Sequence, residues 1–309
     1  MPEVLVAIPT FRRPKGLERL LTALEQLVTA AQVSVLVADN DQERQEGLTV
    51  CRRLDARGYR WPLETIVVAE RGIAQARNAL TEHALSHSTA EFIAMLDDDE
   101  WPEPGWLDAF LHVQVETGAD ALHGAVLREF EAAPGTWAQH CQGIAPLRDR
   151  TGQVDMIHGT SNVLLRRACL ENMQKPCFDP GFALTGGEDK DFFTRLKAAR
   201  ARFAWADDAI VRAYVPASRS KLNWALLRAY RVGNSDMRVF LKHERGAGAL
   251  LRESAKIAGA LLLFPAYFPI VALIPDRRVE PLCRLYRAAG KIAALLGSHY
   301  NEYATVHGS

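Results

Sequence analysis

Residues 92–100, with the sequence FIAMLDDDE, join an apolar run to four consecutive acidic residues. The apolar half has the composition of a buried strand, and Asp97, Asp98 and Asp99 follow it directly. Adjacent carboxylates repel one another, so we expect them at a cleft where a divalent cation offsets their charge. Mg²⁺ and Mn²⁺ usually combine one or two carboxylates with substrate phosphates, which favours a nucleotide diphosphate as the ligand. A solvated acidic loop is the alternative.

Three further β-rich runs precede this segment, at residues 4–10, 33–40 and 65–69. The segments between them have helical spacing, with leucines at positions 17, 20, 21, 24 and 27. This alternation predicts a parallel, doubly wound α/β sheet, in which ligands bind beyond the carboxyl ends of the strands. The polar residues at the four predicted strand ends, which we expect to meet in one crevice, are Pro9-Thr10, Asp39-Asn40, Glu70-Arg71 and Asp97, Asp98 and Asp99. No Gly-x-Gly-x-x-Gly or Gly-Lys-Ser/Thr loop is present, so neither a dinucleotide fingerprint nor a P-loop is supported.

The charge of the chain is unevenly distributed, although its 37 basic and 37 acidic residues cancel. Residues 1–216 hold 23 Lys and Arg against 31 Asp and Glu, whereas residues 217–309 hold 14 against 6. The basic tail indicates an anionic partner, and its apolar content favours lipid over nucleic acid. Five widely spaced cysteines suggest neither a zinc site nor a disulfide framework. The first residues lack the basic region of a signal peptide, so we expect the catalytic body in the cytoplasm.

A second acidic group follows two glycines in the sequence Gly186-Gly187-Glu188-Asp189, before a helix-like segment that begins near Asp191. Glycines at a helix start allow close approach to a ligand, and acids in the first turn favour the helix dipole. Glu188 and Asp189 are therefore either a charged helix terminus or a general base beside a cleft.

In this order the motifs resemble those of the family 2 glycosyltransferases of the GT-A fold, particularly bacterial enzymes that build surface polysaccharides on lipid carriers. The resemblance covers about residues 4–235. Its matching pieces are Ile8-Pro9-Thr10-Phe11, Val37-Ala38-Asp39-Asn40, Arg71-Gly72-x-Ala74-x-Ala76-Arg77-Asn78, Leu96-Asp97-Asp98-Asp99, Gly159-Thr160-Ser161-Asn162 and Gly187-Glu188-Asp189-x-Asp191.

The resemblance implies a nucleotide site formed by several of these pieces. Thr10, Asp39 and Arg71 would surround the uracil of a UDP-sugar, with Asp39 accepting a hydrogen bond from the base, and Pro9 would also belong to the nucleotide site. The second half of the site would consist of Asp97 near the ribose, Asp99 on the metal, Mg²⁺ or Mn²⁺, and Asp98 in a role that the triplet leaves ambiguous. Arg77 either helps to neutralise the diphosphate or forms a surface salt bridge.

The resemblance also implies the chemistry. Asp189 would be the catalytic base, with Glu188 as the competing candidate, and transfer would invert the configuration in one step. The segment with Trp224, Arg228 and Arg231 stands where related enzymes place groups near the diphosphate. It lacks the Gln-x-x-Arg-Trp sequence of processive members, so we expect one sugar to be added per acceptor.

The predicted domains are a GT-A catalytic domain at 1–216 and a helical region at 217–309. In the latter, residues 257–274 are uncharged and reach the length of a membrane span, but Pro265 and Pro269 interrupt them. A span, an interfacial segment and a buried soluble hairpin are all open. Residues 281–296 form an amphipathic pattern with Arg284, Arg287 and Lys291 opposite the apolar side, as in a helix at an anionic membrane surface.

Together these features predict a metal-dependent, inverting glycosyltransferase at the cytoplasmic face of the bacterial inner membrane. Its partners would be a UDP-sugar and a saccharide acceptor linked to polyprenyl diphosphate. A sugar-phosphate nucleotidyltransferase and a non-catalytic, membrane-associated sugar-binding subunit are the alternatives.

Overall fold

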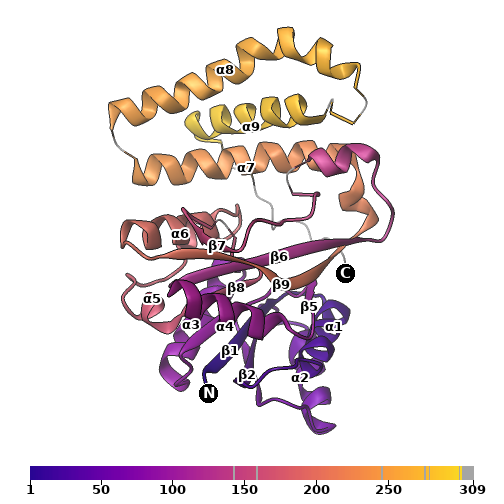
Figure 1. Cartoon of the computed structure of the whole chain (residues 1–309), viewed down its shortest axis with the longest axis vertical. Helices are drawn as coiled ribbons and strands as arrows, with labels where there is room; N and C mark the ends of the chain where they lie inside the picture. Colours follow the sequence, from indigo (N-terminus) through magenta and orange to yellow (C-terminus); the bar gives the residue numbers. More distant parts are fainter. Residues whose placement is uncertain are drawn as a thin grey trace.

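Four parallel strands form the first half of the sheet, in the spatial order β3-β2-β1-β4 (Figure 1). The computed structural model describes residues 1–300 apart from 142, 158, 245, 275, 278 and 299, so the last nine residues of the predicted helical region lie outside it. The strands are β1 (Glu3–Thr10), β2 (Gln32–Asp39), β3 (Leu63–Val67), β4 (Phe92–Met95), β5 (Glu100–Pro102), β6 (Ala121–Phe130), β7 (Gly152–Val154), β8 (Val163–Arg166) and β9 (Phe203–Val215). The helices are α1 (Pro14–Glu25), α2 (Glu46–Ala56), α3 (Ile73–His87), α4 (Trp106–Thr117), α5 (Arg167–Glu171), α6 (Glu188–Ala198), α7 (Leu222–His243), α8 (Ala247–Ala272) and α9 (Val279–Leu295). Short 3₁₀ turns are η1 (Thr136–His140), η2 (Pro180–Phe182) and η3 (Ala217–Ser220).

Both faces of the strands β2, β1 and β4 are buried, because alternate residues of these strands pack against different helices, whereas the edge strand β3 is partly exposed. On β1, Val4, Val6 and Ile8 share a core with α1, α2 and α4. Leu5 and Ala7 face the opposite core, which contains side chains of α3, α5 and α6. The predicted leucines of α1 are almost fully buried, and each contributes about 1.5–3 kcal/mol by leaving water. The predicted strand–helix alternation is therefore confirmed.

Beyond β4 the sheet becomes mixed, which the parallel pattern did not include. β8 runs antiparallel to both β4 and β6, and β9 then runs parallel to β6. The buried Asn162 joins these strands, since its amide donates to the carbonyls of Ala125 and Ala209, 2.9 Å away in each case. Its Oδ1 accepts from the indole N–H of Trp106 at 2.7 Å. The Gly-Thr-Ser-Asn motif thus closes the second half of the sheet through a satisfied buried amide.

The helices α7, α9 and α8 form a layer at one end of the molecule, with α7 nearest the sheet and α8 outermost (Figure 1). α7 and α9 approach closely at two glycines. A Cβ on Gly290 would lie 1.9 Å from the carbonyl oxygen of Tyr230, and one on Gly233 would lie 2.0 Å from that of Arg287. Small residues allow this backbone contact, so α9 belongs to the layer.

The basic side chains of α9 have other partners than those predicted for a helix that faces lipid. Arg287 pairs with Asp236 of α7 at 2.5 Å, and Lys291 pairs with Glu253 of α8. These two cations neutralise acids inside the layer, whereas Arg284 pairs with Glu280 on the surface at 2.5 Å. Two of the three cations assigned to anionic lipid therefore serve helix packing.

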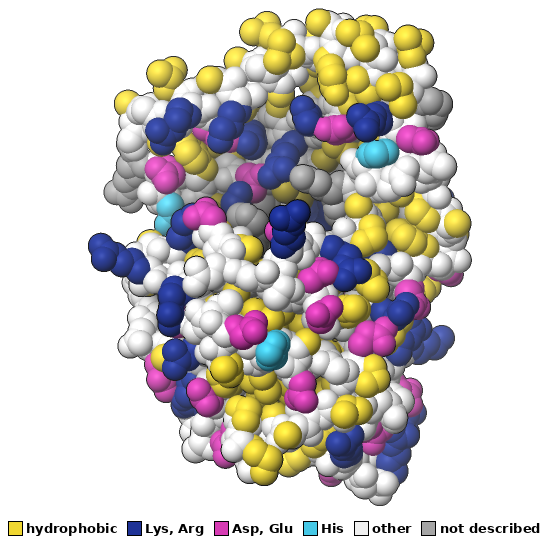
Figure 2. Space-filling model, in the orientation of Figure 1, with side chains coloured by type: hydrophobic (Ala, Val, Ile, Leu, Met, Phe, Trp, Pro, Cys, Tyr) yellow, Lys and Arg dark blue, Asp and Glu magenta, His cyan; other side chains and the backbone are white. Residues whose placement is uncertain are grey.

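α8 instead presents the exposed apolar surface. Residues Ala247–Val271 are long and apolar enough to cross a membrane, and only 11% of the most apolar window is buried. The helix continues through Pro265 and Pro269, and Leu262 is 77% exposed. Figure 2 shows hydrophobic side chains gathered along the α8 edge, with Lys and Arg beneath them. This exposure disfavours the buried soluble hairpin.

Candidate functional site

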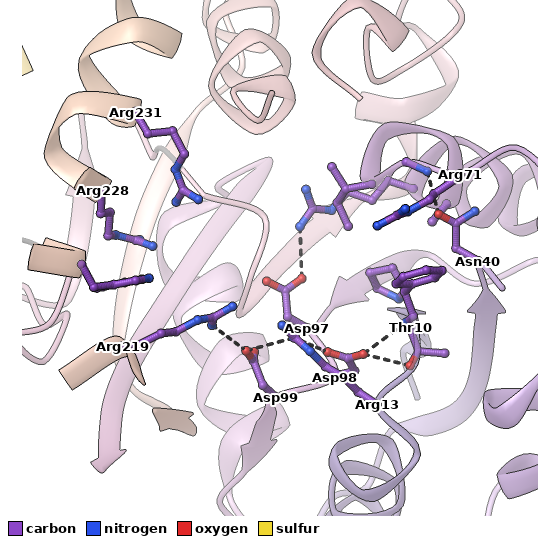
Figure 3. Close-up of a pocket in the computed structure, with 17 residues that line it drawn as sticks. Thr10, Arg13, Asn40, Arg71, Asp97, Asp98, Asp99, Arg219, Arg228 and Arg231 are labelled. Carbon is purple, nitrogen blue, oxygen red and sulfur yellow. Dashed lines mark hydrogen bonds and ion pairs between the residues drawn. The ribbon is translucent and has the colours of Figure 1, made fainter. Parts of the chain in front are cut away.

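A cavity of about 250 Å³ lies beyond the carboxyl ends of β1, β2 and β4 (Figure 3). The strands are aligned so that Thr10 pairs with Asp39 and Ala7 pairs with Met95, which brings the following residues to one edge. The lining consists of Pro9, Thr10, Phe11, Arg13, Asn40, Arg71, Gly72, Ile73, Ala76, Arg77, Asp97, Asp98, Asp99, Arg219, Trp224, Arg228 and Arg231. The predicted crevice at the strand ends is therefore present.

Asp98 is the buried member of the acidic triplet. Its carboxylate accepts hydrogen bonds from Thr10 Oγ1 at 2.8 Å and from Arg13 at 2.9 Å. Burial raises the pKa of Asp98 to about 6, while the charge of Arg13 acts in the opposite direction. Asp98 thus fixes the loop after β1 to the end of β4.

The other two carboxylates are more open and contact different arginines. Asp97 lies 3.1 Å from Arg77, whereas Asp99 lies 3.2 Å from Arg13 and 3.4 Å from Arg219. Arginines therefore offset charges that the sequence analysis assigned to a cation alone. Asp99 keeps a quarter of its side chain exposed, so an oxygen can face a ligand in the cavity.

The fit of this site to Mg²⁺ or Mn²⁺ depends on the donor set. The described residues contain no group of three or more His, Cys, Asp or Glu side chains suited to a metal ion. An oxygen donor such as Asp99 beside a cavity that several arginines line fits a cation that takes its other ligands from phosphates and water. The residues therefore fit a metal bound together with a nucleotide better than a closed protein cage.

Asp39 has a different environment from the one predicted. Its oxygens accept hydrogen bonds from the backbone N–H groups of Asp41 at 3.1 Å and Leu48 at 3.0 Å, and it does not line the cavity. Burial raises its pKa. The cavity wall at this strand end is Asn40, whose Oδ1 accepts from the N–H of Gly72 at 2.7 Å and so holds the Arg71 loop. The Arg71 guanidinium lies over the Phe11 ring, 4.7 Å from its centre.

Glu188 and Asp189 occupy the first turn of α6, after glycines in the left-handed region at φ +73° and +104°. The carboxylate of Glu188 is buried and binds Arg77, while none of the described residues donates a hydrogen bond to its second oxygen. Burial raises the pKa of Glu188 to about 7, and the adjacent Asp189 adds to this. Asp189 is half-buried, and one of its oxygens accepts from the N–H of Lys190 at 2.7 Å.

Asp189 lies close to the charges of the cavity although it is not part of the lining. Burial raises the pKa of Asp189, and the charge of Asp97 raises it further. The charges of Arg77 and Arg231 act in the opposite direction. Because those three residues line the cavity, the structure brings both predicted acids to its border.

Residues 5–172 match the family described as Glycosyl transferase family 2. The chain belongs to this family. It is 31% identical to the succinoglycan biosynthesis protein ExoM of Rhizobium meliloti (strain 1021), over 94% of this chain and 92% of that protein. The family assignment decides for a glycosyltransferase and against a nucleotidyltransferase.

Solved structures share the GT-A fold with this glycosyltransferase at low identity. The mannosyltransferase PcManGT from Pyrobaculum calidifontis, in complex with GDP-Man and Mn²⁺, is 17% identical with a TM-score of 0.64, over 96% of this chain and 88% of that one. S. aureus TarS 1–349, in complex with UDP, is 15% identical with a TM-score of 0.52, over 97% of this chain and 93% of that one.

The glycosyltransferase has cavity residues that the sequence analysis did not include. Neither Arg13 nor Arg219 belongs to the predicted site residues. Arg219 lies in η3, 120 residues after Asp99, so no local spacing connects them. For Arg13, the one signal in the sequence is its position three residues after the end of the first predicted strand.

Proposed function

We propose that this glycosyltransferase moves one sugar from a UDP-sugar to a hydroxyl group of a saccharide acceptor in polysaccharide biosynthesis. The observation that carries this is the cavity in which the end of β1, the acidic triplet and arginines of α7 meet. The relative ExoM supports the biosynthetic context, and the TarS complex supports UDP. The PcManGT complex contains GDP-Man, which makes a GDP-sugar the second candidate donor.

The nucleotide would lie with its base near Thr10 and the Phe11–Arg71 pair. Asp39, which lies outside the cavity lining, would fix the loop after β2, and Pro9 would shape the end of β1. Arg228 and Arg231 project toward the cavity from α7 (Figure 3). Guanidinium groups suit phosphate oxygens, so these residues would bind the diphosphate together with Arg77.

Asp99 would be the protein ligand of Mg²⁺ or Mn²⁺. The cation, when bound, stabilises the negative charge of the departing diphosphate. Asp97 would orient the ribose, and Asp98 would maintain the loop geometry through Thr10 and Arg13. The neighbour with Mn²⁺ supports a metal-dependent reaction.

Asp189 would be the catalytic base. It takes the proton of the acceptor hydroxyl as that oxygen bonds to the anomeric carbon, and the bond from this carbon to UDP breaks on the opposite side. A single displacement inverts the configuration. The partial exposure of Asp189 favours it over Glu188, whose carboxylate is buried against Arg77. Glu188 would hold Arg77 beside the donor.

The acceptor would be a saccharide linked to polyprenyl diphosphate. A second cavity of about 590 Å³ shares Arg13, Asp98, Asp99 and Arg219 with the first. Basic residues outnumber acidic ones in its lining, which suits an anionic acceptor group: Arg12, Arg13, Lys15, Arg19, Arg44 and Arg219 stand against Glu46, Asp98, Asp99 and Glu131. An acceptor of this class would require an enzyme at a lipid surface.

The exposed apolar surface of α8 would attach the enzyme to the cytoplasmic face of the inner membrane. A helix lying in the interface fits the antiparallel, side-by-side packing of α8 on α9 better than a span does (Figure 1). Residues 1–216 would form the catalytic domain and 217–309 the attachment region. The arginines of α7 make the second region part of the donor site as well.

The test is calorimetric binding of UDP to the purified protein with Mn²⁺ and with EDTA. We expect Mn²⁺-dependent binding that Asp99→Ala abolishes and that the surface variant Asp155→Ala retains. GDP in place of UDP distinguishes the second donor. Failure to bind either nucleotide under any metal condition would overturn the donor assignment and point to a donor with another nucleotide.

A further inference from the structure

One face of α7 holds the segment that carries Glu188 and Asp189. Ser235, Arg238 and Lys242 are spaced so that they share this face. Ser235 donates to the carbonyl of Gly186 at 3.1 Å, and Arg238 donates to that of Gly181 at 2.8 Å. The donor-facing arginines, Arg228 and Arg231, lie earlier on the same helix.

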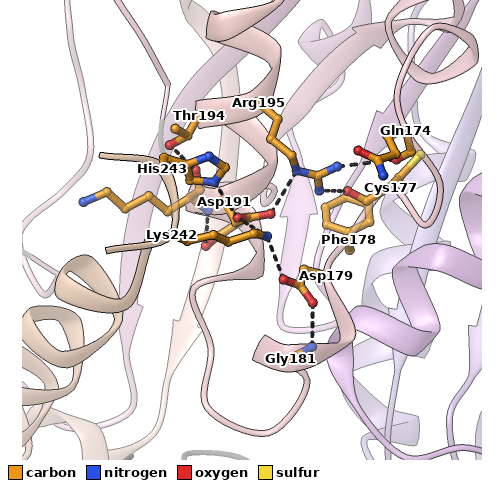
Figure 4. Close-up of polar contacts among 12 residues, drawn as sticks. Gln174, Cys177, Phe178, Asp179, Gly181, Asp191, Thr194, Arg195, Lys242 and His243 are labelled. Atoms are coloured by element: carbon orange, nitrogen blue, oxygen red, sulfur yellow. Dashed lines mark hydrogen bonds and ion pairs between the residues drawn. The ribbon is translucent and has the colours of Figure 1, made fainter. Parts of the chain in front are cut away.

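The centre of this contact is Asp191, in the first turn of α6 (Figure 4). Its side chain is completely buried. Lys242 Nζ lies 2.6 Å and His243 Nε2 lies 2.8 Å from one oxygen, and Arg195 Nε lies 2.9 Å from the other. A buried carboxylate with several charged partners resists displacement, because losing a partner leaves an uncompensated charge.

Asp191 follows the candidate base by two residues in the same helical turn. A displacement of this turn therefore moves Asp189 relative to the donor bound by Arg228 and Arg231. Shifts of about 1 Å at a reacting group can cost about 100-fold in rate. α7 is therefore the rigid element that connects the arginines facing the donor to the turn that carries the base.

We propose that Asp191 is a positioning residue for sugar transfer: Lys242 and His243, at the end of α7, clamp its carboxylate and thereby set the place of Asp189. This proposal rests on Asp189 being the base. It also gives the region after residue 216 a role in the reaction besides attachment.

The experiment compares Lys242→Met with Lys242→Arg. Lys242 is partly exposed, so its replacement should leave the protein folded. The readouts are kcat and KM for UDP release from UDP-sugars with water as the acceptor, and hydrogen exchange of residues 185–192. We expect Lys242→Met to lower kcat about tenfold or more with KM within twofold, and to increase exchange in this segment. Lys242→Arg keeps the positive charge, so it should retain most of the wild-type kcat and most of the wild-type protection from exchange.

Two further variants separate the clamp from its surroundings. Asp179 is the other carboxylate on Lys242, at 2.6 Å, and Asp179→Asn should keep kcat within twofold because Asn can still accept from the N–H of Gly181. Asp191→Asn should lower kcat and increase hydrogen exchange as Lys242→Met does. The proposal is overturned if Lys242→Met keeps the wild-type kcat and hydrogen exchange. It is also overturned if Asp179→Asn lowers kcat as much as Lys242→Met does. Loss of UDP binding in the calorimetric test would contradict the proposed donor, while hydrogen exchange, which needs no turnover, would still decide the clamp.

Discussion

Arg77 of α3 binds the buried carboxylate of Glu188 of α6, a residue 111 positions later in the chain. The same guanidinium lies 3.1 Å from Asp97 at the end of β4. One side chain therefore connects the donor cavity to the turn that carries the candidate base. Its charge also opposes the burial that raises the pKa of Glu188 and Asp189.

Replacement of Arg77 by Met should destabilise the fold by about 3–5 kcal/mol, because Glu188 would lose its partner in a buried site. Chemical denaturation at pH 8 measures this. The exposed Arg148, which pairs with Asp207, is the control, and Arg148→Met should change the stability much less than Arg77→Met does. Equal losses in the two variants would contradict the buried-pair interpretation.

The stability of the protein should depend on the ionisation of Glu188. Its pKa rises to about 7 in the folded protein, so folding favours the protonated form. The resulting stabilisation is present below the ordinary pKa of a glutamate and is lost as pH rises through about 7. Relative to Glu188→Gln, the wild type should therefore lose up to about 3 kcal/mol between pH 4.5 and pH 8. A constant difference between the two proteins over this range would rule out the shift.

Asp189→Asn should lower kcat by about 10²–10⁴-fold, since an amide cannot accept the acceptor proton. Binding of UDP should change little because Asp189 does not line the cavity. Steady-state UDP release and calorimetry together check this. If Glu188→Gln abolishes turnover while Asp189→Asn retains it, the two roles are exchanged.

Changing Leu262, Leu263 and Ile270 of α8 to Ser should weaken binding to anionic phospholipid vesicles, because each is at least 66% exposed. Burial of such a side chain contributes about 1.5–3 kcal/mol. Vesicle flotation at low and high salt measures the effect. Val115→Ser, at another exposed apolar position, is the control and should bind as the wild type does. Complete release of the wild type by salt alone would exclude apolar insertion.

Gly290→Ala should separate α9 from α7, because a Cβ there would meet the carbonyl oxygen of Tyr230. We expect a loss of about 1–3 kcal/mol in stability, as for other overpacked interfaces. Thermal unfolding checks this against Gly248→Ala, a helical glycine of α8 with open space around it. A wild-type melting temperature for Gly290→Ala would show that the helices are not in close contact.

The sequence by itself determined the parallel half of the fold and its functional edge. Alternating strand and helix patterns have periods of two and 3.6 residues that burial imposes locally, so they can be recognised without the fold. Because parallel strands end at one edge, the polar residues after β1, β2 and β4 could be expected to meet there. The family motifs supported the same cavity.

Only the tertiary structure decided which charges compensate the acidic triplet and where α9 lies. Arg219 and Asp99 are far apart in the chain, and their contact depends on the pairing of β9 with β5, which brings the residues after β9 to the triplet. The amphipathic pattern of α9 is the same for a helix on lipid and for one packed on α7, so Arg287 and Asp236 could not be paired from spacing. A local pattern records the polarity of a face, whereas the partner of that face depends on contacts between distant segments.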